Sequence, residues 1–192
     1  MKHKLQSERT ILSPLVPGDV DLALEMFTDP EVVRYIDDGV MSENDIHEQM
    51  SSWIKRGSDG CIGVWCISDH KTGEKYGSCA LLPMPIDEDD TNWDLVVPDM
   101  MPDADIEVGY FLKKSAWGKG LATEACSRLI RFAFEEASLT HVLATIDDDN
   151  HGSRNVLEKV GFVYQGRRRA YAEDSPIFQI DRDRWLEVKQ KR

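Results

Sequence analysis

The feature that most constrains this chain is a strand, a glycine-containing turn and a long helix in direct succession. Residues 106–112 are mostly apolar and predict a strand. Residues 113–120 form a turn with two glycines, and residues 121–137 carry small apolar side chains at helical spacing. A strand predicted over 140–146 completes a strand–helix–strand unit, which is typical of parallel neighbours joined by a right-handed crossover.

The remaining predicted elements surround this unit. The first half predicts a strand over 10–16, helices over 19–27 and 42–57, a short helical piece over 28–36, and a hairpin of strands over 61–68 and 75–84. The last part predicts a helix over 150–160, strands over 162–166 and 176–180, and a solvated turn at Arg167, Arg168 and Arg169. The order predicts a mixed α/β fold in one domain over residues 1–192, with its core at about 10–185.

Charge and hydropathy exclude several function classes. The chain has 23 Lys and Arg against 35 Asp and Glu, which gives a net charge of −12. Such an acidic chain is poorly suited to nucleic acid, since phosphate backbones bind clustered cations. No stretch approaches the roughly 18 apolar residues of a membrane span, and no apolar run follows the basic first residues as a secretory signal requires. We therefore expect a soluble, cytoplasmic protein that does not bind membranes.

The four cysteines indicate no metal site. Cys61, Cys66, Cys79 and Cys126 form no C-x-x-C pair, and no histidine stands at zinc-ligand spacing from them. We expect them to be reduced, buried, small apolar side chains.

The turn at Gly118, Lys119 and Gly120 is a candidate anion site. Glycine lets the backbone approach a ligand closely and adopt positive φ. The first N–H groups of the following helix are unpaired and lie at its positive end, where phosphate oxygens bind. The turn lacks both the P-loop pattern and the third glycine of the dinucleotide fingerprint. Taken alone, it equally fits a tight connection between strand and helix.

A later segment adds to this turn. Residues 150–162 have the pattern N-x-x-S-x-x-V-L-E-K-V-G-F, and the turn itself reads W-G-K-G-L-A-T-E-A over 117–125. With T-D-P-E-V-V-R-Y-I at 28–36, these segments resemble the GCN5-related N-acetyltransferase (GNAT) superfamily, in the branch of the ribosomal-protein-alanine N-acetyltransferases. The resemblance covers about Thr10 to Trp185. It implies a mixed sheet of about seven strands, split into a V at the fourth and fifth strands, 106–112 and 140–146, and flanked by about four helices.

The resemblance also implies acetyl-CoA as cofactor and assigns residues to it. The backbone at Phe111, Leu112 and Lys113 would pair with the pantetheine arm. The pyrophosphate would be held by the amides of Trp117, Gly118, Lys119, Gly120, Leu121, Ala122 and Thr123. Asn150 would bond the pantetheine, and Ser153 would lie near the thioester sulfur.

Acetyl transfer to an amine requires a base for the ammonium, a donor for the oxyanion and a donor for the thiolate. Glu107 is the candidate general base, directly or through water, and the alternative is a solvated surface carboxylate. A backbone N–H near Phe111 or Leu112 would serve the oxyanion. Many relatives carry a tyrosine acid where this chain has Leu157, so Ser153 is the remaining hydroxyl, with helix capping as its alternative role.

The acceptor is indicated by an acidic loop at 85–106, which has eight Asp and Glu and no Lys or Arg. Its negative field would concentrate cationic amines, such as a protein N-terminus, a lysine, a polyamine or an aminoglycoside. The alternative is a loop that only aids solubility. We hypothesise an acetyl-CoA-dependent N-acetyltransferase with direct attack in a ternary complex. A transferase of another acyl-CoA and a non-catalytic CoA sensor remain alternatives, and the chain fits a monomer or a homodimer.

Overall fold

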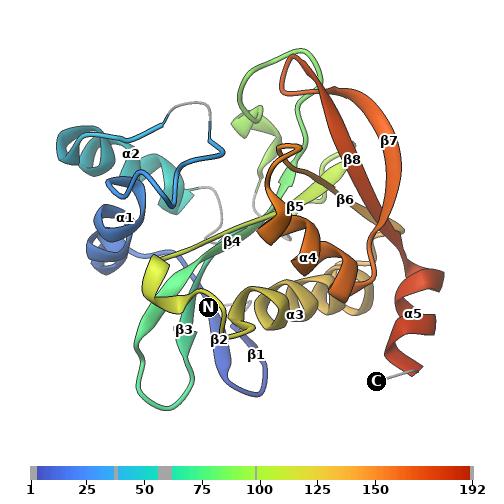
Figure 1. The fold of residues 1–192 in the computed structure, drawn as a ribbon, viewed down its shortest axis with the longest axis horizontal. Coiled ribbons are helices and arrows are strands. Elements are labelled where there is room, and N and C mark those ends of the chain that lie inside the picture. The colour runs from blue at the N-terminus through green and yellow to red at the C-terminus, as the bar shows by residue number, and fades with distance from the viewer. Residues whose placement is uncertain (1–3, 37–38, 56–61, 98, 191–192) are drawn as a thin grey trace.

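The protein is a single mixed sheet with helices on both of its faces, as seen in a computed structural model (Figure 1). The structure describes residues 4–36, 39–55, 62–97 and 99–190. The eight strands run in the order β1-β2-β3-β4-β5-β6-β8-β7. Within this part of the chain, no helix has the length and apolar character needed to cross a membrane.

The strands are β1 Leu5–Gln6, β2 Thr10–Pro14, β3 Gly63–Asp69, β4 Lys75–Pro83, β5 Ile106–Leu112, β6 His141–Thr145, β7 Val163–Ala170 and β8 Glu173–Asp181. The helices are α1 Val20–Phe27, α2 Glu43–Lys55, α3 Leu121–Glu135, α4 His151–Val160 and α5 Arg182–Gln190. Short 3-10 turns lie at Pro17–Asp19, Trp93–Leu95 and Lys114–Ala116.

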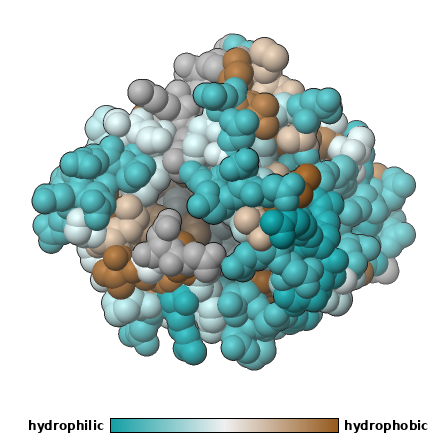
Figure 2. Space-filling model, turned by 90° about the horizontal axis from the view of Figure 1, so that it is seen from above, coloured by the Kyte–Doolittle hydropathy of each residue, from teal (hydrophilic) through white to brown (hydrophobic). Residues whose placement is uncertain are grey.

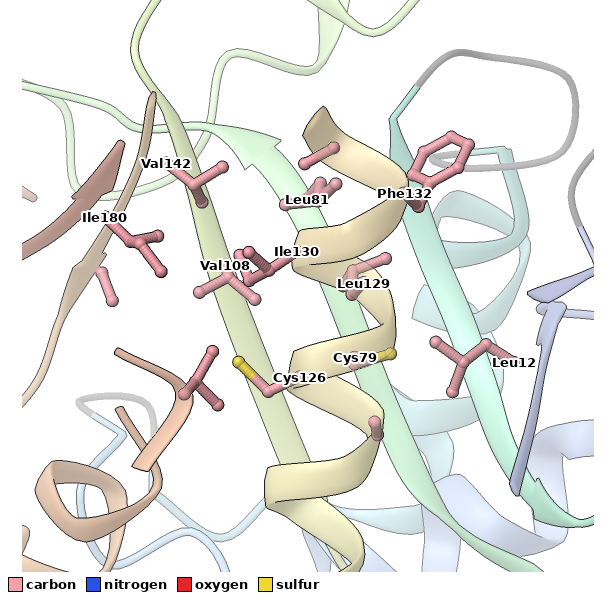
Figure 3. Close-up of a cluster of buried hydrophobic side chains, with 14 of the residues drawn as sticks. Leu12, Cys79, Leu81, Val108, Cys126, Leu129, Ile130, Phe132, Val142 and Ile180 are labelled. Carbon is pink, nitrogen blue, oxygen red and sulfur yellow. The ribbon is translucent and has the colours of Figure 1, made fainter. Parts of the chain in front are cut away.

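The main hydrophobic core lies between the sheet and α3. Leu129 and Ile130 of α3 are fully buried, and Figure 3 shows them beside Leu81 of β4 and Val108 of β5. The apolar stripe predicted over 121–137 therefore forms the central helix of the fold. On the other face of the sheet, α1 and α2 form a second, smaller cluster against Cys66 of β3. Successive strand residues point to opposite faces, so β3 contributes to both clusters.

The cysteine prediction is confirmed where the structure describes it. Cys66, Cys79 and Cys126 are buried free thiols. Burial raises the pKa of Cys66 and of Cys126 to about 12, so both stay protonated at neutral pH. Cys61 lies outside the described residues. Among the described residues, no group of three or more His, Cys, Asp or Glu is placed to hold a metal ion.

The mixed α/β prediction is confirmed, with differences at the edges of the chain. Two elements were not predicted from the sequence: the additional strand β1, which is only two residues long, and the additional helix α5, which is weakly amphipathic. The helical piece predicted over 28–36 is wrong. The Asp29 carboxylate accepts a bond from the Glu31 N–H instead, and the segment runs as successive turns.

The β7–β8 end of the sheet departs further from the sequence prediction. The three arginines at 167–169 lie inside β7, and the predicted turn is wrong. Each arginine has a carboxylate partner: Arg167 pairs with Asp148 and Asp174, Arg168 with Asp105, and Arg169 with Asp87. The turn instead falls at Tyr171 and Ala172, both at positive φ. Because β8 inserts between β6 and β7, only β5 and β6 are the parallel neighbours that the sequence predicts.

Candidate active site

The sheet opens between β5 and β6. Along its whole length β5 pairs with β4, but it pairs with β6 at a single position, Glu107 opposite Leu143. Beyond Glu107 the two parallel strands separate. The start of α4 contacts β5 here, because the Ser153 Oγ lies 2.9 Å from the Tyr110 hydroxyl. The split expected between strands 106–112 and 140–146 is therefore present, with Glu107 at its closed end.

The backbone of β5 presents polar groups to this opening. The Lys113 N–H donates to the Tyr76 carbonyl at 2.9 Å. Because strand residues alternate in direction, the Phe111 N–H faces β4, and the N–H groups of Tyr110 and Leu112 face the opening. Of the two expected oxyanion donors, Leu112 is therefore the one whose N–H faces the opening.

The turn after β5 leaves helix amides uncapped. Gly118 and Gly120 have φ of 71° and 75°, in the left-handed region that favours glycine. Gly120 is the residue before α3, and no side chain caps the helix there. The Trp117 amide is already used, since it donates to the Lys114 carbonyl at 3.1 Å. The amides available to a ligand therefore begin at Gly118 and not, as expected, at Trp117.

Contacts from the connection between β1 and β2 hold this turn in place. Arg9 donates from Nη1 to the Lys119 carbonyl at 2.9 Å and from Nε to the Glu124 carboxylate at 2.6 Å. The Ser7 hydroxyl donates to the same carboxylate at 2.6 Å. The indole N–H of Trp117 reaches back to the Leu112 carbonyl at 2.7 Å. The turn thus has a fixed shape, while the Lys119 side chain is left exposed.

Glu107 is a buried carboxyl, with 7% of its surface exposed. The Tyr171 hydroxyl donates to its Oε1. Burial raises the pKa of Glu107 to about 7, although the Tyr171 bond opposes the shift. The alternative of a solvated surface carboxylate is therefore wrong. A carboxyl with this pKa exchanges protons near neutral pH, as a general base must.

Ser153 and Asn150 lie at the start of α4. The Ser153 Oγ is 2.9 Å from the Tyr110 hydroxyl of β5. Asn150 is the helix N-cap, and its Oδ1 accepts the Ser153 N–H at 3.0 Å. The capping role considered for Ser153 is therefore filled by Asn150. Leu157, one turn further on, is fully buried in the core.

The two candidate catalytic groups approach the opening from opposite faces of β5. Tyr110, which holds Ser153, packs against the α3 core, whereas Glu107 lies an odd number of residues away. On the Glu107 face, Phe111 contacts the Phe27 ring of α1 at 5.9 Å between centroids, and Phe27 contacts Trp53 of α2 at 5.1 Å. An aromatic group therefore borders the Glu107 face of the opening.

The acidic loop is docked on the β7–β8 hairpin. The carbonyls of Pro85 and Ile86 accept the N–H groups of Tyr171 and Ala172 at 3.2 and 3.0 Å. At the end of the loop, Asp105 contacts both Arg168, at 2.5 Å, and His141, at 3.0 Å. Within the loop, a short 3-10 turn lies at Trp93–Leu95. Exposed carboxylates remain at Glu88, Asp89, Asp94 and Asp103. Figure 2 shows that the face seen from above is mostly hydrophilic.

Sequence reasoning missed Tyr171, which carries no motif and which nothing in the sequence links to Glu107. An aromatic on an internal strand is expected in the core, and the ring of Tyr110 is half-buried there, but its hydroxyl reaches the site. A tyrosine, rather than phenylalanine, on a buried strand was the one available signal, since a buried hydroxyl needs a partner.

Residues 9–163 match the acetyltransferase (GNAT) domain family. The chain belongs to the GNAT acetyltransferase family. A GNAT protein is an acyltransferase enzyme.

Individual GNAT relatives agree with this assignment. The N-acetyltransferase p20 of Bacillus licheniformis, itself uncharacterized, is 27% identical over 168 residues, which cover 87% of this chain and 86% of that protein. YdaF of Bacillus subtilis, provisionally named a ribosomal N-acetyltransferase, is 43% identical over 63 residues, or 33% of this chain and 34% of that protein. A GNAT acetyltransferase structure from Bacillus anthracis superposes with a TM-score of 0.74 at 18% identity, covering 94% of this chain and 99% of that one, and shows the shared fold.

Proposed function

We propose that this GNAT protein transfers the acetyl group of acetyl-CoA to a primary amine, with both substrates bound together and the amine attacking the thioester directly. One observation carries the proposal. A buried carboxyl with a pKa of about 7, Glu107, stands at the closed end of an opening whose other border is the uncapped glycine turn. A proton acceptor and an anion site are thus joined by one strand, β5.

The residues around the opening fit coenzyme A. The N–H groups of Tyr110 and Leu112 face a space with no strand to bond, so an amide-containing arm can pair with them. The amides from Gly118 through Thr123 suit a diphosphate. The side-chain NH2 of Asn150 has no partner among the described residues and can bond the arm. The carbonyl of Leu112 is taken by Trp117, so the pairing there depends on the N–H.

Bound acetyl-CoA supplies an acetyl group on a thioester, whose thiolate is the leaving group. Glu107 accepts the proton of the incoming ammonium, directly or through water, which frees the lone pair for attack. The Leu112 N–H donates to the carbonyl oxygen as negative charge develops there. The Ser153 hydroxyl donates to the departing sulfur. It replaces the tyrosine of other family members, because Leu157 has no proton to give.

The acceptor is a cationic amine, either a protein N-terminus or a small molecule. Exposed carboxylates at Glu88, Asp89 and Asp94 lie in the loop whose first residues are bonded to the turn that contacts Glu107. Their field raises the local concentration of cations. The provisional ribosomal name of YdaF favours a protein N-terminus. Three free cysteines fit the reducing cytoplasm as the compartment.

Release of free thiol during incubation with acetyl-CoA and a panel of amines tests the proposal. The panel contains peptides with free N-termini, a polyamine and an aminoglycoside, and Glu107→Gln is assayed beside the wild type. We expect turnover with at least one amine and a loss of about 100-fold or more in Glu107→Gln. Tight acetyl-CoA binding without turnover on any amine would instead identify a CoA sensor. Turnover with a longer acyl-CoA alone would identify another acyl transferase.

A further inference from the structure

We propose that Tyr171 is a positioning residue for the catalytic carboxylate, which holds one oxygen of Glu107, leaves the other to accept the proton of the amine, and ties the base to the acidic loop. This inference rests on the proposed function, because it takes Glu107 as the general base. No family motif includes Tyr171, which comes from the turn between β7 and β8, far from β5 in sequence.

The backbone of Tyr171 is fixed in an uncommon conformation. Tyr171 and its neighbour Ala172 have φ of 53° and 57°, which non-glycine residues adopt rarely and at some cost. Both N–H groups donate to carbonyls at the start of the acidic loop, Pro85 and Ile86. The Tyr171 side chain packs with Met84, Leu143 and Ile177. Backbone and side chain together therefore aim the phenol at Glu107.

Thr91 of the acidic loop lies close to the Tyr171–Glu107 bond. The Tyr171 hydroxyl donates to Glu107 Oε1, and the Thr91 side chain is near enough to the Tyr171 hydroxyl to lower its pKa against the opposing effect of burial. Thr91 is 5% exposed although it lies in the acidic loop. Asp90 secures it, since Asp90 Oδ1 accepts the Thr91 N–H at 2.7 Å and Oδ2 accepts the Trp93 indole N–H at 2.8 Å. The acidic loop is thus connected to the carboxylate through Tyr171, whose backbone it bonds and whose hydroxyl Thr91 approaches.

The bond from Tyr171 occupies only one of the two carboxylate oxygens of Glu107. No described residue bonds Glu107 Oε2, so the oxygen that is not held by Tyr171 is the one available to the amine. A donor to Oε1 also stabilises the ionised carboxylate, which burial would otherwise keep protonated. Tyr171 itself stays protonated and remains a donor, because burial and the nearby Glu107 raise its pKa.

The other charged groups near Glu107 have partners of their own. Asp105, the residue before β5, contacts Arg168 of β7 at 2.5 Å and His141 of β6 at 3.0 Å. In the loop, Asp90 lies close enough to raise the pKa of Tyr171. Leu143 of β6 and Leu82 of β4, opposite Glu107 in the sheet, carry no charge. Tyr171 is therefore the one described group that donates a hydrogen bond to this carboxylate.

The test is the single-turnover rate of acetylation of the best amine as a function of pH. In the wild type the rate rises as Glu107 loses its proton near pH 7. In Tyr171→Phe the ionised carboxylate loses its donor, so the rising limb moves to higher pH by about one unit. Below the limb the rate falls about tenfold relative to the wild type. Thr91→Val moves the limb in the same direction by less, because it removes a polar group that favours ionisation of Tyr171 and leaves the bond from Tyr171 to Glu107 in place.

Tyr164→Phe is the matched control, because its hydroxyl is exposed on β7 and has no hydrogen-bond partner among the described residues. The rising limb of its pH–rate curve should coincide with that of the wild type. Affinity for acetyl-CoA, measured by calorimetry, stays within about twofold in all three variants and shows that the fold is intact. A wild-type limb in Tyr171→Phe would overturn the proposal. An unmoved limb in Thr91→Val would overturn the link to the loop. Failure of the proposed function is seen separately, as wild-type protein without turnover or an unimpaired Glu107→Gln.

Discussion

The hydroxyl of Tyr110 lies 2.9 Å from the Oγ of Ser153, and this contact joins β5 to α4 across the opening in the sheet. The same hydroxyl lies 3.2 Å from the Ser153 carbonyl. Where β5 and β6 no longer pair, a side chain therefore supplies the connection that backbone hydrogen bonds supply elsewhere. The bond also fixes the only hydroxyl that the resemblance places beside the thioester.

Removal of this hydroxyl should weaken the fold measurably. Tyr110→Phe removes the hydroxyl that donates to the Ser153 carbonyl and contacts the Ser153 Oγ in a half-buried setting, so we expect a loss of about 1 kcal/mol in the free energy of unfolding. Urea denaturation measures it. Tyr164→Phe is the control, and should change stability by less than about 0.5 kcal/mol. Equal effects of the two substitutions would mean that the Tyr110 contact contributes nothing to stability.

The turn glycines should separate stability from cofactor binding. Gly118→Ala places a side chain at φ 71° with open space around the new Cβ, so it strains the backbone by about 1 kcal/mol. Gly73→Ala does the same at φ 75° in the β3–β4 turn, also in open space. Both variants should lose similar stability in thermal melts. Only Gly118→Ala should also bind acetyl-CoA more weakly, and equal affinities would argue against a role of this turn in binding.

Glu107 should make stability depend on pH in a specific window. Its pKa is raised from 4.5 to about 7 in the folded state, so the neutral form is favoured. The stability that the protein gains from the raised pKa of Glu107 is fully present below pH 4.5 and is lost as pH rises through about 7. Glu107→Gln should therefore be more stable than the wild type above that pH, by up to about 3 kcal/mol. The difference should vanish in acid. Parallel curves for the two proteins across the window, from urea melts at each pH, would contradict the buried carboxyl.

The exposed loop carboxylates should act on acceptor binding alone. We expect Glu88→Gln, Asp89→Asn and Asp94→Asn together to raise KM for a cationic acceptor several-fold, since the field that concentrates cations weakens. The effect should fade with added salt. kcat and the affinity for acetyl-CoA should stay unchanged. The control removes the same number of charges at Glu158, Asp183 and Glu187 on α4 and α5. An equal rise in KM would assign the effect to net charge and not to the loop.

The sequence predicted the parts of this site that depend on local pattern. The apolar stripe of 121–137, the glycines at Gly118 and Gly120, and the cap–helix segment at 150–162 are each contained in one short stretch, and each was placed correctly. Glu107 was singled out for the same reason, as a carboxylate on the strand that leads into the turn, and its role as general base stays a prediction.

The rest depends on contacts between distant segments. The Tyr171–Glu107 bond joins residues 64 apart, and nothing in either local sequence encodes it. The arginines at 167–169 have the polar composition of a solvated turn, but carboxylates from three other segments pair with them, and the arginines lie in β7 instead. The place of β8 between β6 and β7 is likewise set by pairing across the sheet. The periodicity of apolar residues predicts helices and strands, but it does not predict the order of the strands.

The central claim is that the amides from Gly118 through Thr123 hold the diphosphate of coenzyme A. Isothermal titration calorimetry of the folded protein with acetyl-CoA, and with S-acetylpantetheine, which lacks the diphosphate, tests it most directly. The account predicts that acetyl-CoA binds at one site, and that S-acetylpantetheine binds at least about 100-fold more weakly because it forfeits the charge-assisted bonds at the turn. Equal affinities for the two compounds, or no heat with acetyl-CoA, would contradict it.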